Sequence, residues 1–158
     1  MSEPRKLLVK KLKEKQLTIA LAESVTCGLA AHKLSTLPGV SEILSGSVVC
    51  YTPEVKTGLL GVPEKLIKKY SCESVQVTKS LAERLRVLIK ADIHAAVTGL
   101  ASPGGSETKN KPVGTIFLSV CHKRKIYSQK FLFRGTPVEI RTKACDALYK
   151  MIVKGINS

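Results

Sequence analysis

The alternation of apolar runs and helical repeats along this chain predicts an α/β fold. Apolar runs typical of strands occupy residues 17–22, 43–51, 93–97, 113–120 and 126–133. Helical spacing or capping residues mark 4–15, 29–37, a short stretch from Pro53, 64–70, 74–90 and a last helix from Pro137 toward Gly155. We therefore expect one domain over residues 1–158. Its expected fold is a three-layer α/β/α sandwich on a mixed, mainly parallel sheet with one antiparallel pair.

Local chemistry marks where several of these elements begin. Thr52 and Ser74 stand where N-cap residues are expected, and Thr136 and Glu139 have the spacing of a capping box. Gly46, inside a predicted strand, indicates a bulge or a close backbone approach. The last two apolar runs are separated by a link short enough for a hairpin.

Composition limits the classes of protein to which this chain can belong. Of its 158 residues, 44% are hydrophobic and 24% charged, as in globular domains. No apolar run approaches the ~20 residues of a membrane span, and the start lacks the apolar core of a signal peptide, so we expect a cytoplasmic protein. The five cysteines form no C-x-x-C pair and the three histidines are scattered, which favours free thiols and no metal site.

The net charge of +14 points to anionic partners without saying which. Phosphate contacts supply most non-specific affinity for nucleic acid, but a small phosphate-bearing substrate also needs positive charge. Basic residues are spread from Arg5 to Lys154, as on solvated faces. Aromatic residues make up only 4% and Trp is absent, which argues against a base-stacking surface. Nucleic-acid binding is therefore an alternative and not our expectation.

The segment from Ala22 to Gly28 is the first candidate for chemistry. An apolar run precedes it and a helical segment follows, so it predicts a strand, a tight polar turn and a helix. The N–H groups and the dipole at a helix start favour negative charge. Ser24 is thus placed to act as a nucleophile or to contact an anion. The alternative is that Ser24 or Thr26 merely caps the helix.

Three predicted strands end in polar, reactive side chains: Ser24, Tyr51 and Thr98. Ligands of open α/β sheets bind outside the carboxyl ends of the strands, so we expect a site where these residues converge. No histidine lies near a strand end, which leaves Lys56 and Tyr51 to take the Ser24 proton. A lysine titrates near roughly 10.4 and needs a desolvated pocket or a neighbouring positive charge to act as a base near neutrality. The alternatives are a surface lysine and a tyrosine packed at a strand end.

Residues 98–106 form the most loop-like stretch of the chain, with Gly104 and Gly105 adjacent. Glycine allows backbone N–H groups to converge, as in the nests that hold phosphates. The stretch matches neither Walker A nor GxGxxG. A plain turn is the alternative.

Four blocks of the sequence together resemble the C-terminal domain of the competence/damage-inducible protein CinA, a domain that also occurs alone as nicotinamide-nucleotide amidohydrolase. The resemblance extends from about Leu17 to Leu148. Its blocks are LAESVTCG at 21–28, LPGVSEILSGSVVCYTPEVKTGLLGVP at 37–63, AVTGLASPGG at 96–105 and KPVGTIFLSV at 111–120. It implies a three-layer α/β/α sandwich that hydrolyses the carboxamide of nicotinamide mononucleotide to nicotinate mononucleotide and ammonia, with no metal or cofactor.

The same resemblance implies roles for individual residues. Ser24 would be the nucleophile, assisted by Lys56 and Tyr51. The residues predicted to bind the substrate are Thr26, Gly28, Thr98, Gly99, Gly104, Gly105 and Arg141, with Thr98 near the amide and Arg141 at the phosphate. The resulting hypothesis is that neutral Lys56, aided by Tyr51, takes the Ser24 proton. N–H groups at the helix start would hold the oxyanion.

The chain departs from the family pattern near this site. The departures are Thr26-Cys27-Gly28 for the usual Thr-Gly-Gly, Pro53 for Asn, Ser102 for Gly, and Thr136-Pro137 for Asp-Arg. A catalytically weakened or inactive, nucleotide-binding member of the family is therefore the alternative function. Because the chain begins with Met and a short helix, we expect a stand-alone unit. We also expect it to form a homo-oligomer.

Overall fold

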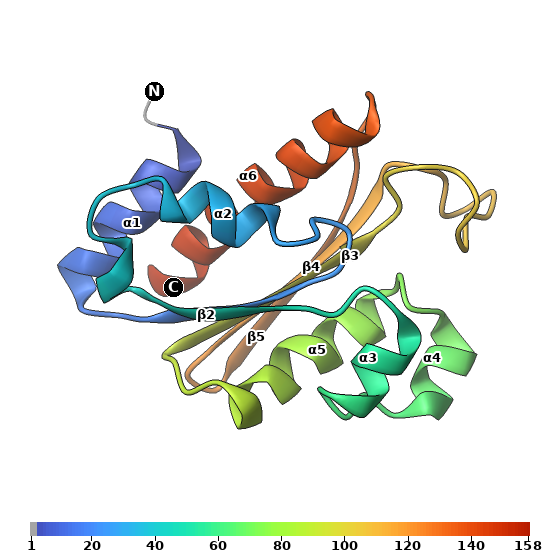
Figure 1. Cartoon of the computed structure of the whole chain (residues 1–158), viewed down its shortest axis with the longest axis horizontal. Helices are drawn as coiled ribbons and strands as arrows, with labels where there is room; N and C mark the ends of the chain where they lie inside the picture. Colours follow the sequence, from blue (N-terminus) through green and yellow to red (C-terminus); the bar gives the residue numbers. More distant parts are fainter. Residues whose placement is uncertain (1–2) are drawn as a thin grey trace.

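The computed structural model describes residues 3–158 and arranges them around one five-stranded sheet (Figure 1). The strands are β1 (Ile19–Glu23), β2 (Leu44–Val49), β3 (Ile93–Gly99), β4 (Thr115–His122) and β5 (Lys125–Leu132), in the order β2-β1-β3-β4-β5. β1 is parallel to β2 and β3, whereas β4 is antiparallel to both β3 and β5. The mixed sheet is confirmed, but it has two antiparallel pairs instead of one. The reason is that the segment between β3 and β4 contains no helix to cross over the sheet and keep β4 parallel.

Helices cover both faces of the sheet, which confirms the three-layer arrangement (Figure 1). One face carries α1 (Pro4–Lys15), α2 (Leu29–Ser35) and α6 (Pro137–Ile156), and the other carries α3 (Pro53–Gly58), α4 (Glu64–Tyr70) and α5 (Val75–Leu88). Because β1, β2 and β3 are mutually parallel, the turns that follow them meet at one edge of the sheet. This edge lies at the right of Figure 1, where the loop after β3 projects.

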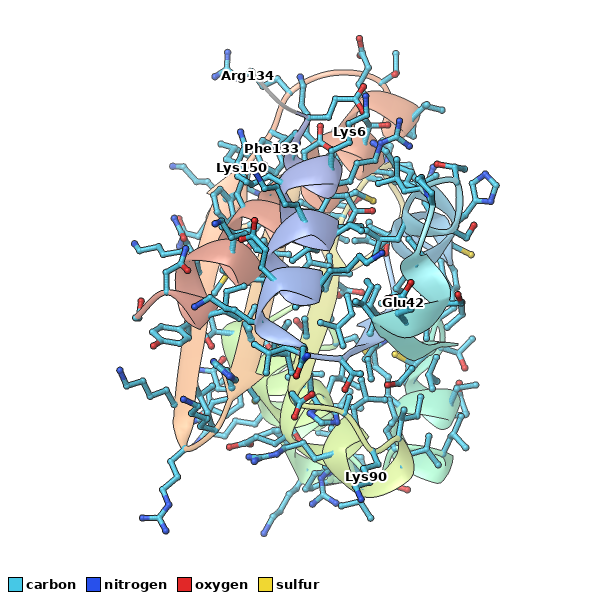
Figure 2. All side chains as sticks on the ribbon, turned by 90° about the vertical axis from the view of Figure 1, so that its left-hand side faces the viewer. Lys6, Glu42, Lys90, Phe133, Arg134 and Lys150 are labelled. Carbon is cyan, nitrogen blue, oxygen red and sulfur yellow. The ribbon has the colours of Figure 1, made fainter. Side chains whose placement is uncertain are left out.

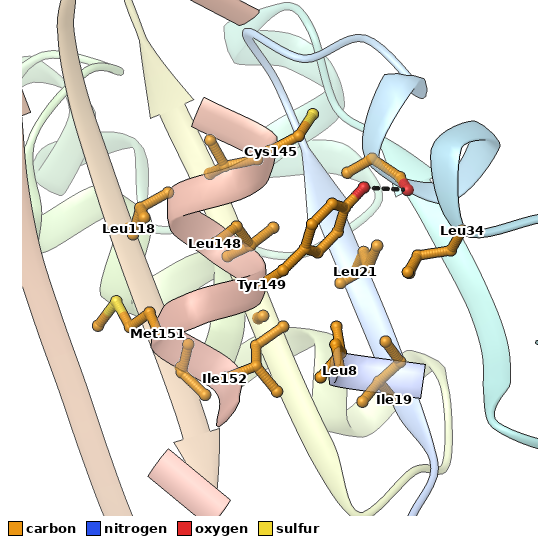
Figure 3. Close-up of a cluster of buried hydrophobic side chains, with 14 of the residues drawn as sticks. Leu8, Ile19, Leu21, Leu34, Leu118, Cys145, Leu148, Tyr149, Met151 and Ile152 are labelled. Atoms are coloured by element: carbon orange, nitrogen blue, oxygen red, sulfur yellow. Dashed lines mark hydrogen bonds between the residues drawn. The ribbon is translucent and has the colours of Figure 1, made fainter. Parts of the chain in front are cut away.

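Apolar side chains fill the space between the sheet and each helical layer. Figure 3 shows the cluster under α1, α2 and α6, in which Leu21 and Leu118 of the sheet pack with Leu148 of α6. The hydroxyl of Tyr149 donates to the carbonyl of Ala30 at 2.8 Å, the dashed line in Figure 3, and ties α6 to α2. A second cluster lies under α5 on the opposite face. Helices thus pack on both faces of the sheet, and the site is expected at its carboxyl edge, where the strands end in loops.

The predicted starts of three helices are confirmed. Thr52, Ser74 and Thr136 each accept a hydrogen bond from the N–H group three residues further on, and the capping box of Thr136 and Glu139 is complete. The pairing register of β1 and β2 shifts beside Gly46, which confirms the predicted irregularity. The other boundaries differ by a few residues: α2 already ends at Ser35, two residues before its predicted end.

Basic side chains project from several elements. In Figure 2, Lys6 on α1 and Lys150 on α6 lie toward the upper end of the molecule, whereas Lys90, after α5, lies at the lower end. All five cysteines are free thiols, as expected. Between residues 3 and 158, the structure contains no helix whose length and apolar character would let it cross a membrane.

Candidate active site

Ser24 stands at the carboxyl end of β1, in the turn that joins this strand to α2. Its N–H donates to the carbonyl of Val97 on β3 at 3.0 Å, and the residue is 7% exposed. The turn passes through Cys27 and Gly28, whose φ values are 48° and 89°. Glycine adopts this left-handed conformation freely, whereas Cys27 is strained by it. The predicted succession of strand, turn and helix is confirmed.

Glu23, the last residue of β1, is a fully buried carboxylate that the sequence analysis missed. It accepts hydrogen bonds from the N–H groups of Ala30 (3.0 Å) and Ala31 (2.9 Å) and from the hydroxyls of Thr26 (2.7 Å) and Ser47 (2.9 Å). The N-terminus of α2 therefore holds this carboxylate, where the helix dipole favours negative charge. The hypothesis that these N–H groups face Ser24 and hold an oxyanion is wrong, because Glu23 already occupies them.

The sequence did contain a signal for Glu23. An acidic residue closes an apolar run, and a predicted helix starts after one short turn. If such a run is buried, its carboxylate must find donors, and the nearest unused donors are those of the helix start.

Lys56 lies one turn into α3, and its side chain reaches Ser24. Nζ is 3.0 Å from Ser24 Oγ, and it donates to the carbonyls of Cys50 (2.6 Å) and Tyr51 (3.2 Å). The residue is fully buried, and none of the ion pairs found in residues 3–158 involves it. The two residues therefore meet as the sequence predicts, and Lys56 is not a surface lysine.

Three oxygens surround Nζ: the hydroxyl of Ser24 and the carbonyls of Cys50 and Tyr51. None of the ion pairs in residues 3–158 supplies a counter-ion, so only these oxygens compensate for the burial of the amine. Lys56 is thus in hydrogen-bond reach of the proton that a nucleophilic serine must lose.

Tyr51 contributes its backbone to this arrangement and its ring to the wall beside it. Its carbonyl accepts from Lys56, and the residue is 58% exposed. Within residues 3–158 its hydroxyl forms no hydrogen bond with Ser24 or Lys56. A part for the phenol in proton transfer stays a prediction.

A hollow of about 360 Å³ opens beside Ser24 at the carboxyl edge of the sheet. This volume is within the range of small-molecule sites. Its wall combines the Ser24 turn, the β3–β4 loop, one acidic residue and one arginine. The lining residues are Ser24, Val25, Tyr51, Glu73, Gly99 to Gly105 and Arg141.

Three residues predicted to contact the substrate do not line this hollow. Thr26 is 1% exposed and its hydroxyl donates to Glu23, and Gly28 is the N-cap of α2. Thr98 lies inside β3, not in the loop, and its buried hydroxyl pairs with that of Thr78 at 2.8 Å. In the structure the hydroxyls of Thr26 and Thr98 are used inside the fold, and substrate contacts by Thr26, Gly28 and Thr98 stay predictions.

Gly99, Gly104 and Gly105 do line the hollow. The N–H groups of Gly104 and Gly105 converge on the carboxylate of Glu107, at 2.7 Å and 2.8 Å. These hydrogen bonds hold the pKa of Glu107 below its usual value of 4.5. A nest is present, as one of the two readings of the sequence predicted, but here a carboxylate of the same chain fills it.

Arg141, on the first turns of α6, reaches the Ser24 turn from the opposite side of the sheet to α3. Its Nε donates to the carbonyl of Val25 at 3.0 Å, and the residue lines the hollow. This hydrogen bond fixes the guanidinium at one nitrogen. Its terminal N–H groups make no hydrogen bond within residues 3–158 and are free to bind an anion.

A slightly larger hollow, of about 420 Å³, lies between β5 and α6. Phe131, Phe133 and Met151 line it, with lysines around them, and it contains no serine, cysteine or histidine. A third hollow, of about 430 Å³, is larger still, so size alone does not identify the site; of the three, only the hollow of about 360 Å³ is lined by Ser24.

A serine hydroxyl in contact with a buried lysine, at the carboxyl edge of a three-layer sandwich, defines this chain as an α/β protein with a candidate Ser–Lys site. A family model described as the CinA C-terminal domain matches residues 2–156. The chain therefore belongs to the CinA C-terminal domain family.

Curated relatives and solved structures agree with this assignment. A CinA-like protein of Thermotoga neapolitana is 37% identical over 138 residues, 87% of this chain and 33% of that protein. A CinA-like protein of Pseudothermotoga lettingae is 39% identical over 113 residues, 72% of this chain and 28% of that protein. The chain spans about a third of the length of the curated relatives it matches.

The fold is shared along the whole chain with solved members. The crystal structure of the competence/damage inducible protein CihA from Agrobacterium tumefaciens has a TM-score of 0.92 at 25% identity, covering 100% of this chain and 98% of that one. A CinA superfamily protein from Escherichia coli has a TM-score of 0.89 at 25% identity, covering 95% and 87%. These names refer to competence and damage and state no reaction.

Proposed function

We propose that this domain hydrolyses the carboxamide of nicotinamide mononucleotide to nicotinate mononucleotide and ammonia, with Ser24 as nucleophile and Lys56 as general base. The observation that carries the proposal is the 3.0 Å separation of Lys56 Nζ and Ser24 Oγ in a buried, carbonyl-lined position. The resemblance to amidohydrolases of the CinA family supports the choice of substrate. The hollow beside Ser24 supports a substrate of nucleotide size.

The reaction needs one proton carrier and one covalent intermediate. Ser24 Oγ bonds to the amide carbon as its proton passes to Lys56 Nζ. When the resulting tetrahedral oxyanion collapses, the C–N bond breaks, and Lys56 returns the proton to the departing nitrogen, which leaves as ammonia. Water then attacks the ester, loses its proton to Lys56 and releases the carboxylate, after which Ser24 regains its hydrogen.

Two further groups fit this reaction. The N–H of Val25, the residue after the nucleophile, has no acceptor within residues 3–158 and is the donor we assign to the oxyanion. Arg141, with its terminal N–H groups free, is assigned to the phosphate. Tyr51 forms the neighbouring wall.

An ammonia-release assay with nicotinamide mononucleotide, nicotinamide riboside and nicotinamide tests the proposal. We expect the purified protein to release ammonia fastest from the mononucleotide, and Ser24→Ala to abolish this release with unchanged circular dichroism. Ser41→Ala, at an exposed serine outside the hollow, is the matched control and should keep full activity. Turnover by Ser24→Ala would refute the assignment. Binding of the mononucleotide by the unaltered protein without ammonia release would instead support the alternative, a nucleotide-binding member of the family.

A further inference from the structure

Glu73 lines the hollow beside Ser24, yet no step of the proposed reaction uses it. It lies in the connection between α4 and α5 and is half-buried. Among the residues that line this hollow it is the only acidic one. In the proposed reaction Lys56 already takes the Ser24 proton, so a carboxylate in the same hollow calls for another explanation.

The carboxylate of Glu73 has no ion-pair partner among residues 3–158, although the chain is rich in cations. Basic residues outnumber acidic ones by 26 to 12. The hydroxyl of Ser106 is hydrogen-bonded to its Oε2. Lys111 Nζ donates instead to the backbone carbonyl of Glu73 (3.1 Å) and to the hydroxyls of Ser71 (2.6 Å) and Ser106 (3.0 Å). The side chain is therefore held in position at the wall without being neutralised by a direct partner.

Opposite charges thus enter the hollow from opposite layers of the sandwich. Glu73 comes from the layer of α4 and α5, and Arg141 comes from α6 on the other face of the sheet. A ligand with a single negative charge would gain from Arg141 but lose from Glu73. A ligand with a cationic part and an anionic part gains from both.

We infer that Glu73 determines specificity by recognising the positive charge of the substrate's pyridinium ring while Arg141 binds its phosphate. This inference rests on the proposed function, since nicotinamide mononucleotide is such a zwitterion. Its ring nitrogen carries a positive charge because it bonds to the ribose. The exposed ring of Tyr51, in the same wall, offers an aromatic face to the same cation.

A purely structural Glu73 would behave differently. Through Ser106 it would hold the β3–β4 loop equally well for every ligand. Recognition of charge, in contrast, depends on whether the ring is cationic. Two ligands that differ only in ring charge therefore separate the two roles.

The experiment compares binding of nicotinamide mononucleotide with that of its 1,4-dihydro form, which has the same phosphate and a neutral ring. Dissociation constants are measured by calorimetry in the Ser24→Ala background, so that no turnover interferes. Glu73→Gln keeps an acceptor for Ser106 and should raise the dissociation constant of the mononucleotide about tenfold, while that of the dihydro form changes less than twofold. Glu64→Gln makes the same charge change at an exposed position outside this hollow and should affect neither ligand. Arg141→Gln should weaken both ligands by a similar factor.

Equal weakening of both ligands by Glu73→Gln would show a structural role and overturn the inference. The inference would also be overturned if the substitution changed the dissociation constant of neither ligand, or if the parent protein bound neither. If Glu73→Gln unfolds thermally at the same midpoint temperature as the parent protein, misfolding is excluded as the cause of weaker binding. The proposed function is judged separately, by ammonia release from the unaltered protein. If that protein releases none while Glu73→Gln still weakens binding of the mononucleotide and not of the dihydro form, hydrolysis falls and cation recognition stands.

Discussion

Two fully buried side chains, one acidic and one basic, flank Ser24, and they differ in what their partners can do. Glu23 directly precedes it and is surrounded by two backbone N–H groups and two hydroxyls, all of which belong to the scaffold. Lys56 faces three oxygens, one of which is the Ser24 hydroxyl itself. A buried acid with only fixed donors stabilises the turn. A buried amine with a reactive partner can move a proton.

Cys50 connects the surroundings of Glu23, which we call the structural region, with those of Lys56, which we call the chemical region. Its N–H donates to the backbone carbonyl of Glu23 at 2.8 Å, and its own carbonyl accepts from Lys56 at 2.6 Å. The end of β2 therefore sets the distance between the structural region and the chemical one. Substitutions on the two sides should accordingly separate loss of stability from loss of activity.

The largest effect is expected from Lys56→Met, which removes the amine but keeps a side chain of similar length. Loss of a general base lowers kcat by about 10²–10⁴-fold. The free energy of unfolding should fall by about 1–3 kcal/mol, because two buried carbonyls lose a donor while the amine no longer has to be buried. Ammonia release and thermal unfolding measure the two quantities, with Lys65→Met, at an exposed position on α4, as the control.

Lys56→Arg distinguishes a base from a mere hydrogen-bond donor. Arginine keeps the charge and the donors but does not give up its proton near neutral pH. We expect this variant to be as inactive as Lys56→Met. Substantial activity would contradict the role of Lys56 as a base.

The next effect is expected from Glu23→Gln. Both carboxylate oxygens of Glu23 accept from N–H groups at the start of α2. In glutamine one of these oxygens becomes an NH₂ group, which cannot accept, so at least one buried N–H loses its partner. We expect a loss of about 2–3 kcal/mol of unfolding free energy, or roughly 5–10 °C in the midpoint. Glu139→Gln changes the corresponding but exposed carboxylate of the α6 capping box and should cost less than half as much.

Activity completes the test of Glu23. Per folded molecule, Glu23→Gln should retain at least a tenth of the parent rate, because its side chain does not line the hollow. A loss of activity as large as that of Lys56→Met, at an unchanged midpoint, would assign Glu23 a chemical role and remove the distinction drawn here.

The meeting of Ser24 and Lys56 could be predicted because local signals position both residues. The apolar run of β1 ends at the Ser24 turn, and the cap at Thr52 with Pro53 starts α3 so that Lys56 falls one turn later. Parallel neighbouring strands then bring the two ends to one edge. Each step depends on short-range chemistry or on a general rule of topology.

The carboxylates that bind the free N–H groups of the site could not be predicted, because they depend on which donors face a carboxylate in three dimensions. The N–H groups at the start of α2 point to Glu23, and those of Gly104 and Gly105 point to Glu107. Sequence spacing identified both sets of donors, but it could not show that acids of the same chain fill them. The hydroxyl of Thr26, which the family resemblance assigns to the substrate, likewise donates to Glu23.

A smaller effect is expected from Tyr149→Phe, which tests how firmly the Glu23 side is held. Ala30 is fixed at both ends, since its N–H donates to Glu23 and its carbonyl accepts from Tyr149. Burial raises the pKa of Tyr149 well above its usual value of 10.0, so its hydroxyl stays a donor at any working pH. Loss of this bond should cost about 1 kcal/mol, or roughly 2–4 °C, with unchanged activity.

Tyr127 supplies the matched control. Its hydroxyl is buried and has no hydrogen-bond partner in the part of the chain that the structure describes. Tyr127→Phe should therefore leave the midpoint unchanged or raise it. If both Tyr→Phe variants lower the midpoint equally, the bond to Ala30 contributes nothing specific.

The smallest effect is a difference in labelling rate between two thiols, one on each side of Ser24. Burial raises the pKa of Cys145, which packs near Glu23, to about 12, and raises that of Cys50, beside Lys56, above its usual 9.0. Because the thiolate is the reactive form, both should react with iodoacetamide at pH 8 only through local opening, long after the exposed Cys27. We expect Cys50, next to the hollow, to be labelled before Cys145, as followed by mass spectrometry, with labelling in urea showing that all five thiols can react. If Cys145 were labelled as early as Cys50, the surroundings of Glu23 and those of Lys56 would open together. The surroundings of Glu23 would then be no more rigid than those of Lys56, which carry the proposed chemistry.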